Sequence, residues 1–147
     1  MDIKDPNLHL KLQEMCDCYL DTSYEEELNS AADITEGEEP EESAVKYLAL
    51  AIMYGITEKA HSLKLKKKRN GQLKAVLNAE QKIYLPPPSK ELFDRVKGVV
   101  SSILHFEEGG GELPLSLGLR TGQVNLNVKL KEEEDKASLK LKFPQWS

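Results

Sequence analysis

The last third of the chain alternates apolar and polar residues at period two in three successive runs. The runs cover residues 113–119, 124–130 and 139–143, and short breaks at 120–122 and 132–135 separate them. Period two is the spacing of side chains on one face of a β-strand, and runs this close together are joined by tight turns. The pattern therefore predicts an antiparallel three-stranded meander with one apolar face.

A second group of short strand-like runs lies earlier, at residues 62–67, 73–77 and 82–85. Leucines alternate with lysines in the first run, and Asn70 followed by Gly71 is typical of a hairpin turn. We therefore predict a second meander, which has one buried face and one basic face.

Each predicted meander follows a predicted helix. The segment that Ser43 can cap is apolar on nearly every side as far as Lys59, so this helix should form the centre of the core. Three prolines end the last strand of the first meander, and an amphipathic stripe after Ser89 predicts the second helix. The predicted fold class is α+β, a helix plus a three-stranded antiparallel meander repeated twice (α-βββ-α-βββ), in one domain at residues 43–147.

The first 42 residues have a different composition. Apolar residues at spacings of three and four from Leu8 to Tyr19 predict a short helix within residues 1–20. Residues 21–42 hold ten carboxylates and no Lys or Arg, so self-repulsion and scarce apolar groups predict a loose acidic linker with at most one helical turn, near residues 24–28.

Charge is distributed unevenly along the chain. Residues 1–58 hold three basic and 15 acidic residues, a net charge of −12, whereas residues 59–147 hold 17 basic and 10 acidic residues, a net charge of +7. The acidic segment could therefore fold back onto the basic part or onto a second copy of the chain.

The sequence also bears on the compartment. It has no apolar run of about 18 residues, which is the length that spans a bilayer, and its first residues lack the pattern of a secretory signal. Cys16 and Cys18 are too close together for a disulfide that closes the fold. We therefore expect a cytoplasmic protein with free thiols and no membrane insertion.

Two segments carry a family resemblance. The apolar helix at residues 44–59 leads into AHSLKLK at residues 60–66, and GELPLSL at residues 111–117 precedes the last two strands. Over roughly residues 44–143 the chain resembles the PAS-like N-terminal subdomain of the type II secretion and type IV pilus-assembly ATPases. The resemblance implies the PAS-like scaffold without the motor core. It does not imply nucleotide contact, because the family's polar signature of His, Glu, Arg and Asp is replaced by Lys64, Lys66, Glu112 and Ser116.

Residue types that carry catalysis or bind metals are few and scattered. Cys16 and Cys18, with His9 nearby, could bind a soft metal, but two sulfurs at i and i+2 on a helix point to different sides. Ordinary or partner-facing thiols fit better. His61 and His105 lie in other elements, and no hydrolase or metalloprotease motif accompanies them. We therefore expect no enzyme, no cofactor, and no catalytic, cofactor-binding or metal-binding residues.

Three functions fit these features. The leading hypothesis is a non-catalytic interaction or regulatory module, such as an adaptor. In it the helix within residues 1–20 dimerises or attracts a protein partner, because its narrow apolar stripe needs a companion. The first alternative is a PAS-like domain that senses a small ligand in a pocket between a meander and the helix at residues 44–59.

The second alternative is an anion or nucleic-acid binder that uses the hairpin at residues 64–69. The basic residues of this hairpin, and those that could join them on a polar sheet face, are Lys64, Lys66, Lys67, Lys68, Arg69, Lys74, Lys129, Lys140 and Lys142. Such a patch could hold the phosphates of a nucleic acid or of a signalling nucleotide. Alternating lysines are also the ordinary solvated face of a half-buried sheet, and no aromatic residues lie between them to stack on bases. We therefore favour a protein partner or self-association over binding to nucleic acid.

Overall fold

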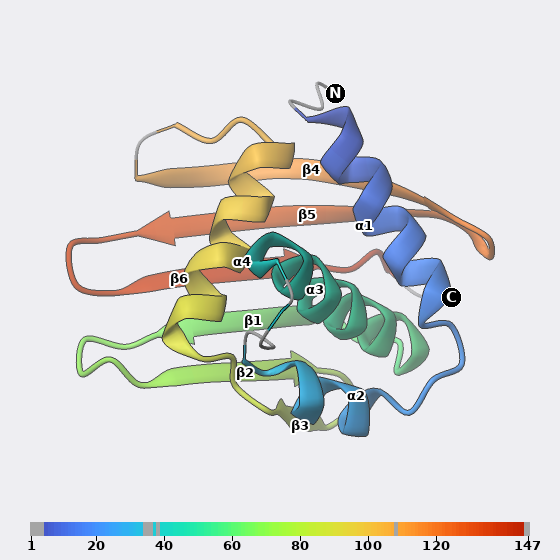
Figure 1. Ribbon diagram of the computed structural model, residues 1–147, viewed down its shortest axis with the longest axis horizontal. Helices are drawn as coiled ribbons and strands as arrows, with labels where there is room; N and C mark the ends of the chain where they lie inside the picture. Colours follow the sequence, from blue (N-terminus) through green and yellow to red (C-terminus); the bar gives the residue numbers. More distant parts are fainter. Residues whose placement is uncertain (1–4, 34–36, 38, 108, 146–147) are drawn as a thin grey trace.

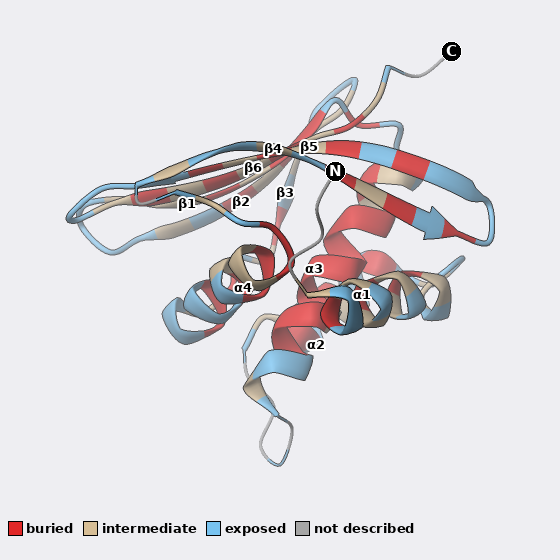
Figure 2. Ribbon diagram, turned by 90° about the horizontal axis from the view of Figure 1, so that it is seen from above, coloured by how far each residue is buried: buried red, intermediate tan, exposed pale blue. Residues whose placement is uncertain are grey.

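A six-stranded antiparallel sheet carries four helices on one of its faces in the part of the chain that the structure describes (Figures 1 and 2). The structure is a computed structural model and describes residues 5–33, 37, 39–107 and 109–145. The helices are α1 (Pro6–Cys18), α2 (Tyr24–Ala31), α3 (Pro40–Thr57) and α4 (Lys90–Ile103). The strands are β1 (Ser62–Lys67), β2 (Leu73–Asn78), β3 (Lys82–Leu85), β4 (Gly110–Leu119), β5 (Gly122–Glu132) and β6 (Ala137–Lys142). The predicted α+β class is confirmed.

The strand order is β3-β2-β1-β6-β5-β4, so two meanders lie side by side in one sheet. The first and last strands along the chain, β1 and β6, are neighbours at the centre of the sheet and join the two meanders, and Leu65 there lies opposite Leu139. Strand β4 begins at Gly110, three residues before the alternating run that was expected at residues 113–119. Gly110 has φ +113°, and a Cβ there would run into the carbonyl oxygen of Leu130, so only glycine fits this close pairing.

Helix α3 forms the centre of the core, as its sequence predicted. All its residues from Ser43 to Met53 are buried except Lys46, because α1, α2, α4 and β1 pack around it (Figure 2). The helix begins at Pro40 rather than at Ser43. Proline is favoured in the first turn of a helix because it has no N–H to satisfy, and the carboxylates that follow favour the positive end of the helix dipole.

The apolar stripe of the N-terminal helix is buried within the same chain. Leu8, Leu12 and Cys16 of α1 are 4%, 0% and 0% exposed, because α1 packs against α3, α4 and β4. Burial of a leucine side chain contributes about 1.5–3 kcal/mol, so this docking needs no second protein. The need for a companion, which motivated the leading hypothesis, is therefore met by the chain itself.

Polar side chains of α1 also bond to the outer edge of β4. The three hydrogen bonds run from His9 Nε2 to the Ser116 carbonyl at 2.7 Å, from the Gly118 N–H to Gln13 Oε1 at 2.6 Å, and from the Arg120 N–H to Asp17 Oδ1 at 3.0 Å. An uncovered sheet edge offers such groups to any other strand. Helix α1 therefore covers the β4 edge of the sheet.

The segment 21–42, expected to be a loose linker, contains α2. Tyr24, Leu28 and Ala31 are buried, at a spacing that places them on one face of this short helix. The ring of Tyr24 stacks on that of Tyr54 in α3, with centroids 5.5 Å apart. Residues 1–4 of the expected N-terminal helix, and residues 34–36 and 38 of the expected linker, lie outside the described residues.

Candidate anion-binding face

The face of the sheet that carries no helix holds a row of three lysines on neighbouring strands. Lys64 of β1 lies directly opposite Lys140 of β6, and Lys140 lies directly opposite Lys129 of β5. Their neighbours along each strand, such as Leu63 and Leu65, are buried beneath the helices, so the alternation of the strands directs the lysines to the open side (Figure 2).

A second row lies two residues further along the same strands. In it Ser138 of β6 stands between Lys66 of β1 and Lys131 of β5. We call Lys64, Lys66, Lys129, Lys131 and Lys140, together with Ser138, the lysine face.

The surface of the lysine face is hollowed. The hollow has a volume of about 270 Å³, and its lining consists of lysines except for Glu133, Ala137 and Ser138. The lysines of the lining are Lys64, Lys66, Lys67, Lys129, Lys131, Lys136 and Lys140. A concave lining of mostly positive charge concentrates the field, so the hollow attracts anions more strongly than a flat surface with the same charge.

Two carboxylates near the hollow pair with lysines that do not belong to the lysine face. Glu133 pairs with Lys136 at 3.1 Å between Oε2 and Nζ, and Glu112 pairs with Lys142 at 3.6 Å. In the described part of the chain, no carboxylate oxygen lies within 4.0 Å of the ammonium groups of the lysine face. The protein therefore places five neighbouring positive charges together with no carboxylate of the described residues in direct contact with them.

This crowding affects the protonation of Lys64. Partial removal from water, followed by the charges of Lys66, Lys140, Lys129 and Lys131, lowers the pKa of the Lys64 ammonium below its ordinary value. Like charges directly opposite each other on adjacent strands also destabilise a sheet. An anion in the hollow would relieve both effects.

The structure brings together only part of the basic hairpin predicted from the sequence. Lys68 contacts Lys74, and the hydrogen bond and charge of that neighbour lower the pKa of Lys68. Arg69 pairs with Asp135 at 3.4 Å, and Lys142 pairs with Glu112, so neither contributes an unpaired charge. The remaining predicted residues, Lys64, Lys66, Lys67, Lys129 and Lys140, line the hollow.

Lys131, Lys136 and Ser138 were not predicted as part of the site. Lys131 continues the alternation of β5 by one step beyond the expected end of that strand, so a longer strand would have included it. Lys136 and Ser138 enter through the pairing of β6 with β1 and β5, which no local pattern reveals.

The other candidate residues lie apart from one another. Cys16 is buried and Cys18 is exposed, and both are free thiols. His9 bonds to the Ser116 carbonyl, whereas His61 and His105 are exposed. Within the ranges that the structure describes, no three His, Cys, Asp or Glu residues are grouped closely enough to hold a metal ion.

Fold and site together define an α+β protein whose open sheet face carries a hollow lined mostly by lysines. The chain matches no protein-family model, and the comparison with curated proteins gives no match. None of the described helices is both long enough and apolar enough to cross a membrane. Function must therefore be argued from the residues of the site.

Proposed function

We propose that the protein is a non-catalytic binding module that holds an anionic partner on its lysine face. The single observation that supports this is the row of Lys64, Lys140 and Lys129, opposite one another on three adjacent strands with no carboxylate in ion-pair distance among the described residues. A sheet under no demand for binding gains stability by alternating charge in such a row. Sites that depart from the most stable arrangement are commonly functional.

The ordinary alternative is a solvated sheet face whose lysines prevent strand association. Lysines in that role are typical of edge strands, where they face other chains. Here the row lies on β1, β6 and β5, which are inner strands with a partner on each side. Protection of an edge therefore does not explain it.

The test uses three anions: immobilised heparin, a short single-stranded oligonucleotide and inorganic tripolyphosphate. The variant Lys64→Gln/Lys140→Gln is compared with Lys90→Gln/Arg95→Gln, which removes the same charge from exposed positions of α4. We expect at least one anion to bind the wild type and the α4 variant alike, and to lose about tenfold or more in affinity for the lysine-face variant. Equal binding by all three proteins, or no binding of any anion at low salt, would contradict the proposal.

We also propose a PAS-like relationship and a cytoplasmic location. A PAS-like relationship to the secretion ATPases is supported by the order of one helix and three strands, repeated from α3 to β6. A cytoplasmic location is supported by the two free thiols, one of them exposed. An adaptor role and a ligand-sensing role both fit a binding module, and the chemistry of the anion distinguishes them.

A further inference from the structure

The lysine face is small in relation to its charge. Adjacent strands lie about 4.8 Å apart and alternate residues of a strand about 6.7 Å apart, so the five lysine stems arise from an area of about 10 Å by 7 Å. All five side chains line the same hollow. Their ammonium groups can therefore converge on one ligand.

We propose, on the basis of the function above, that this site binds a compact polyphosphate group rather than a nucleic-acid strand. A single strand carries one phosphate per about 3.4 Å, so about three charges would cross the lysine face along its longer side. Adjacent phosphate groups of a small molecule supply more charge in the same space, since a phosphate carries up to about two negative charges and offers three acceptor oxygens. Five lysines and the Ser138 hydroxyl provide the donors for such a group.

The boundaries of the lysine face favour a compact ligand as well. Glu133 stands at the lining of the hollow, and two more carboxylates, Glu134 and Asp135, follow it in the turn between β5 and β6. On the opposite side Glu112 of β4 lies across from Lys129. A polymer that continued beyond the hollow in these two directions would pass over ion pairs such as Glu133–Lys136 and Glu112–Lys142, which attract it less than the lysines of the hollow do, whereas a compact anion stays within the hollow.

The size and chemistry of the hollow agree with this choice. Its volume of about 270 Å³ lies just below the range of about 300–1,000 Å³ that is usual for sites of small organic molecules. Among the residues that the structure describes, no aromatic side chain lines it, so its lining offers no ring on which a base could stack. The hollow therefore fits the phosphates themselves.

A polyphosphate group could arrive alone or attached to a nucleoside. Tyr84 of β3 shares the open face with Lys64, because Tyr84 lies opposite Val76 of β2 and Val76 lies opposite Lys64. Its side chain is 71% exposed. A nucleoside whose phosphates occupied the hollow could place its base against Tyr84, about two strand spacings away, or about 10 Å.

The experiment titrates the full chain at low salt with inorganic tripolyphosphate, with orthophosphate, and with an oligonucleotide, using calorimetry. We expect one tripolyphosphate to bind per chain, about tenfold or more tighter than either other anion. Lys64→Gln/Lys140→Gln should abolish that preference and Lys90→Gln/Arg95→Gln should keep it. Glu133→Gln should strengthen binding, because it removes a negative charge from the lining.

A titration with adenosine triphosphate in the same assay shows whether the polyphosphate group comes free or attached to a nucleoside. Tighter binding than tripolyphosphate, lost in Tyr84→Ala, supports a nucleotide; equal binding of the two, unchanged in Tyr84→Ala, supports free polyphosphate. If the oligonucleotide or heparin binds through Lys64 and Lys140 while tripolyphosphate does not, the compact ligand is overturned and the anion-binding function stands. If no anion depends on these two lysines, both proposals fail.

Discussion

Gln13 Oε1 in α1 accepts a hydrogen bond of 2.6 Å from the backbone N–H of Gly118 in β4. Side chains four residues apart on a helix rise by about 6 Å, and residues two apart on a strand by about 6.8 Å. His9 and Asp17, one turn to either side, therefore reach the next groups of the same edge. Side chains of α1 thus bond to backbone groups of β4 that a neighbouring strand would otherwise pair with.

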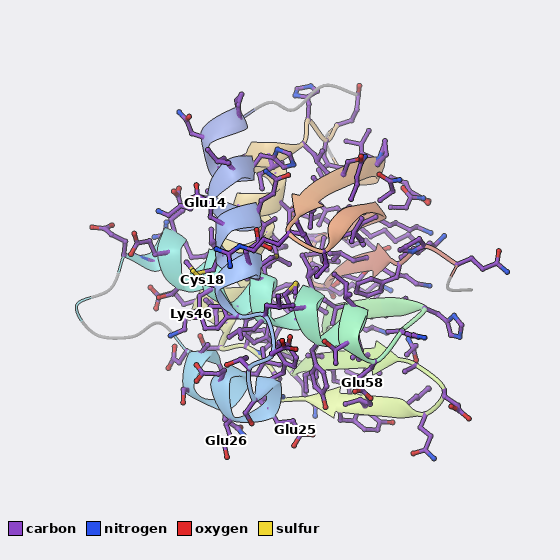
Figure 3. All side chains as sticks on the ribbon, turned by 90° about the vertical axis from the view of Figure 1, so that its right-hand side faces the viewer. Glu14, Cys18, Glu25, Glu26, Lys46 and Glu58 are labelled. Carbon is purple, nitrogen blue, oxygen red and sulfur yellow. The ribbon has the colours of Figure 1, made fainter. Side chains whose placement is uncertain are left out.

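The first prediction concerns this edge. Gln13→Ala should lower the free energy of unfolding by about 1 kcal/mol, because the Gly118 N–H loses its partner. Glu14→Ala is the matched control, since Glu14 is the adjacent exposed residue of α1 (Figure 3). Urea unfolding followed by circular dichroism measures both, and an equal effect of the two substitutions would contradict the role of Gln13.

A second prediction follows for self-association. The triple variant His9→Ala/Gln13→Ala/Asp17→Ala removes all three side-chain bonds to β4 while the buried leucines of α1 stay in place. An edge with free backbone groups pairs with other strands, so the apparent mass in light scattering should rise with protein concentration. A monomer at every concentration would show that α1 blocks the edge by bulk alone.

The third prediction is that Lys64→Gln stabilises the ligand-free protein. Removal of one of two like charges directly opposite each other should raise the free energy of unfolding by about 0.2–1 kcal/mol. Arg95→Gln, on the exposed side of α4, should leave it nearly unchanged. Added salt should narrow the difference between Lys64→Gln and the wild type, because it screens the repulsion. A lower free energy of unfolding for Lys64→Gln than for the wild type would contradict the idea that repulsion between the lysines destabilises the sheet.

The fourth prediction concerns pH. The pKa of Lys64 is lowered in the folded protein by partial burial and then by Lys66, Lys140, Lys129 and Lys131. The charged form is therefore disfavoured by folding, and the resulting destabilisation is complete below the lowered pKa and disappears as pH rises toward the ordinary value of 10.5. The stability gained by Lys64→Gln should shrink over that interval. A gain that grew with pH would contradict this origin.

The fifth prediction separates the two cysteines. Burial, followed by the charge of Asp17, raises the pKa of the Cys16 thiol to about 12, whereas Cys18 is exposed. The thiolate is the reactive form, so iodoacetamide at mildly alkaline pH should modify Cys18 alone in the folded protein. Mass spectrometry of the Cys18→Ser variant should then show modification of Cys16 only after unfolding. Rapid modification of that variant would mean that α1 leaves the core readily.

Most of the strands could be predicted from the sequence, because alternation at period two depends only on which residues face the core. Of α2 the sequence indicated one turn at most, since the stripe of Tyr24, Leu28 and Ala31 lies among carboxylates and is completed by Tyr54 of α3. A helix this short is stable only through packing, and packing partners distant in sequence leave no local pattern.

The lysine face shows the same limit. Alternation placed Lys64 and Lys66 on a polar face of β1, and the chemistry of a phosphate site could be stated from them. Periodicity does not say which strands are neighbours, so the opposition of Lys64 to Lys140 became visible only in the sheet. The hollow, and with it Lys136, depends on that pairing.

The central pairing of β1 with β6 has a consequence for synthesis on the ribosome. Residues 62–67 emerge long before residues 137–142. Strand β1 is therefore made with one side unpaired, and its leucines lack their partners in β6 until residues 137–142 have been made. A nascent chain that stalled before β6 would present a three-stranded ribbon of β1, β2 and β3 and a two-stranded ribbon of β4 and β5, each with an open inner edge. The sheet should therefore fold in one step once β6 has been made, and chains released before that point should depend on chaperones.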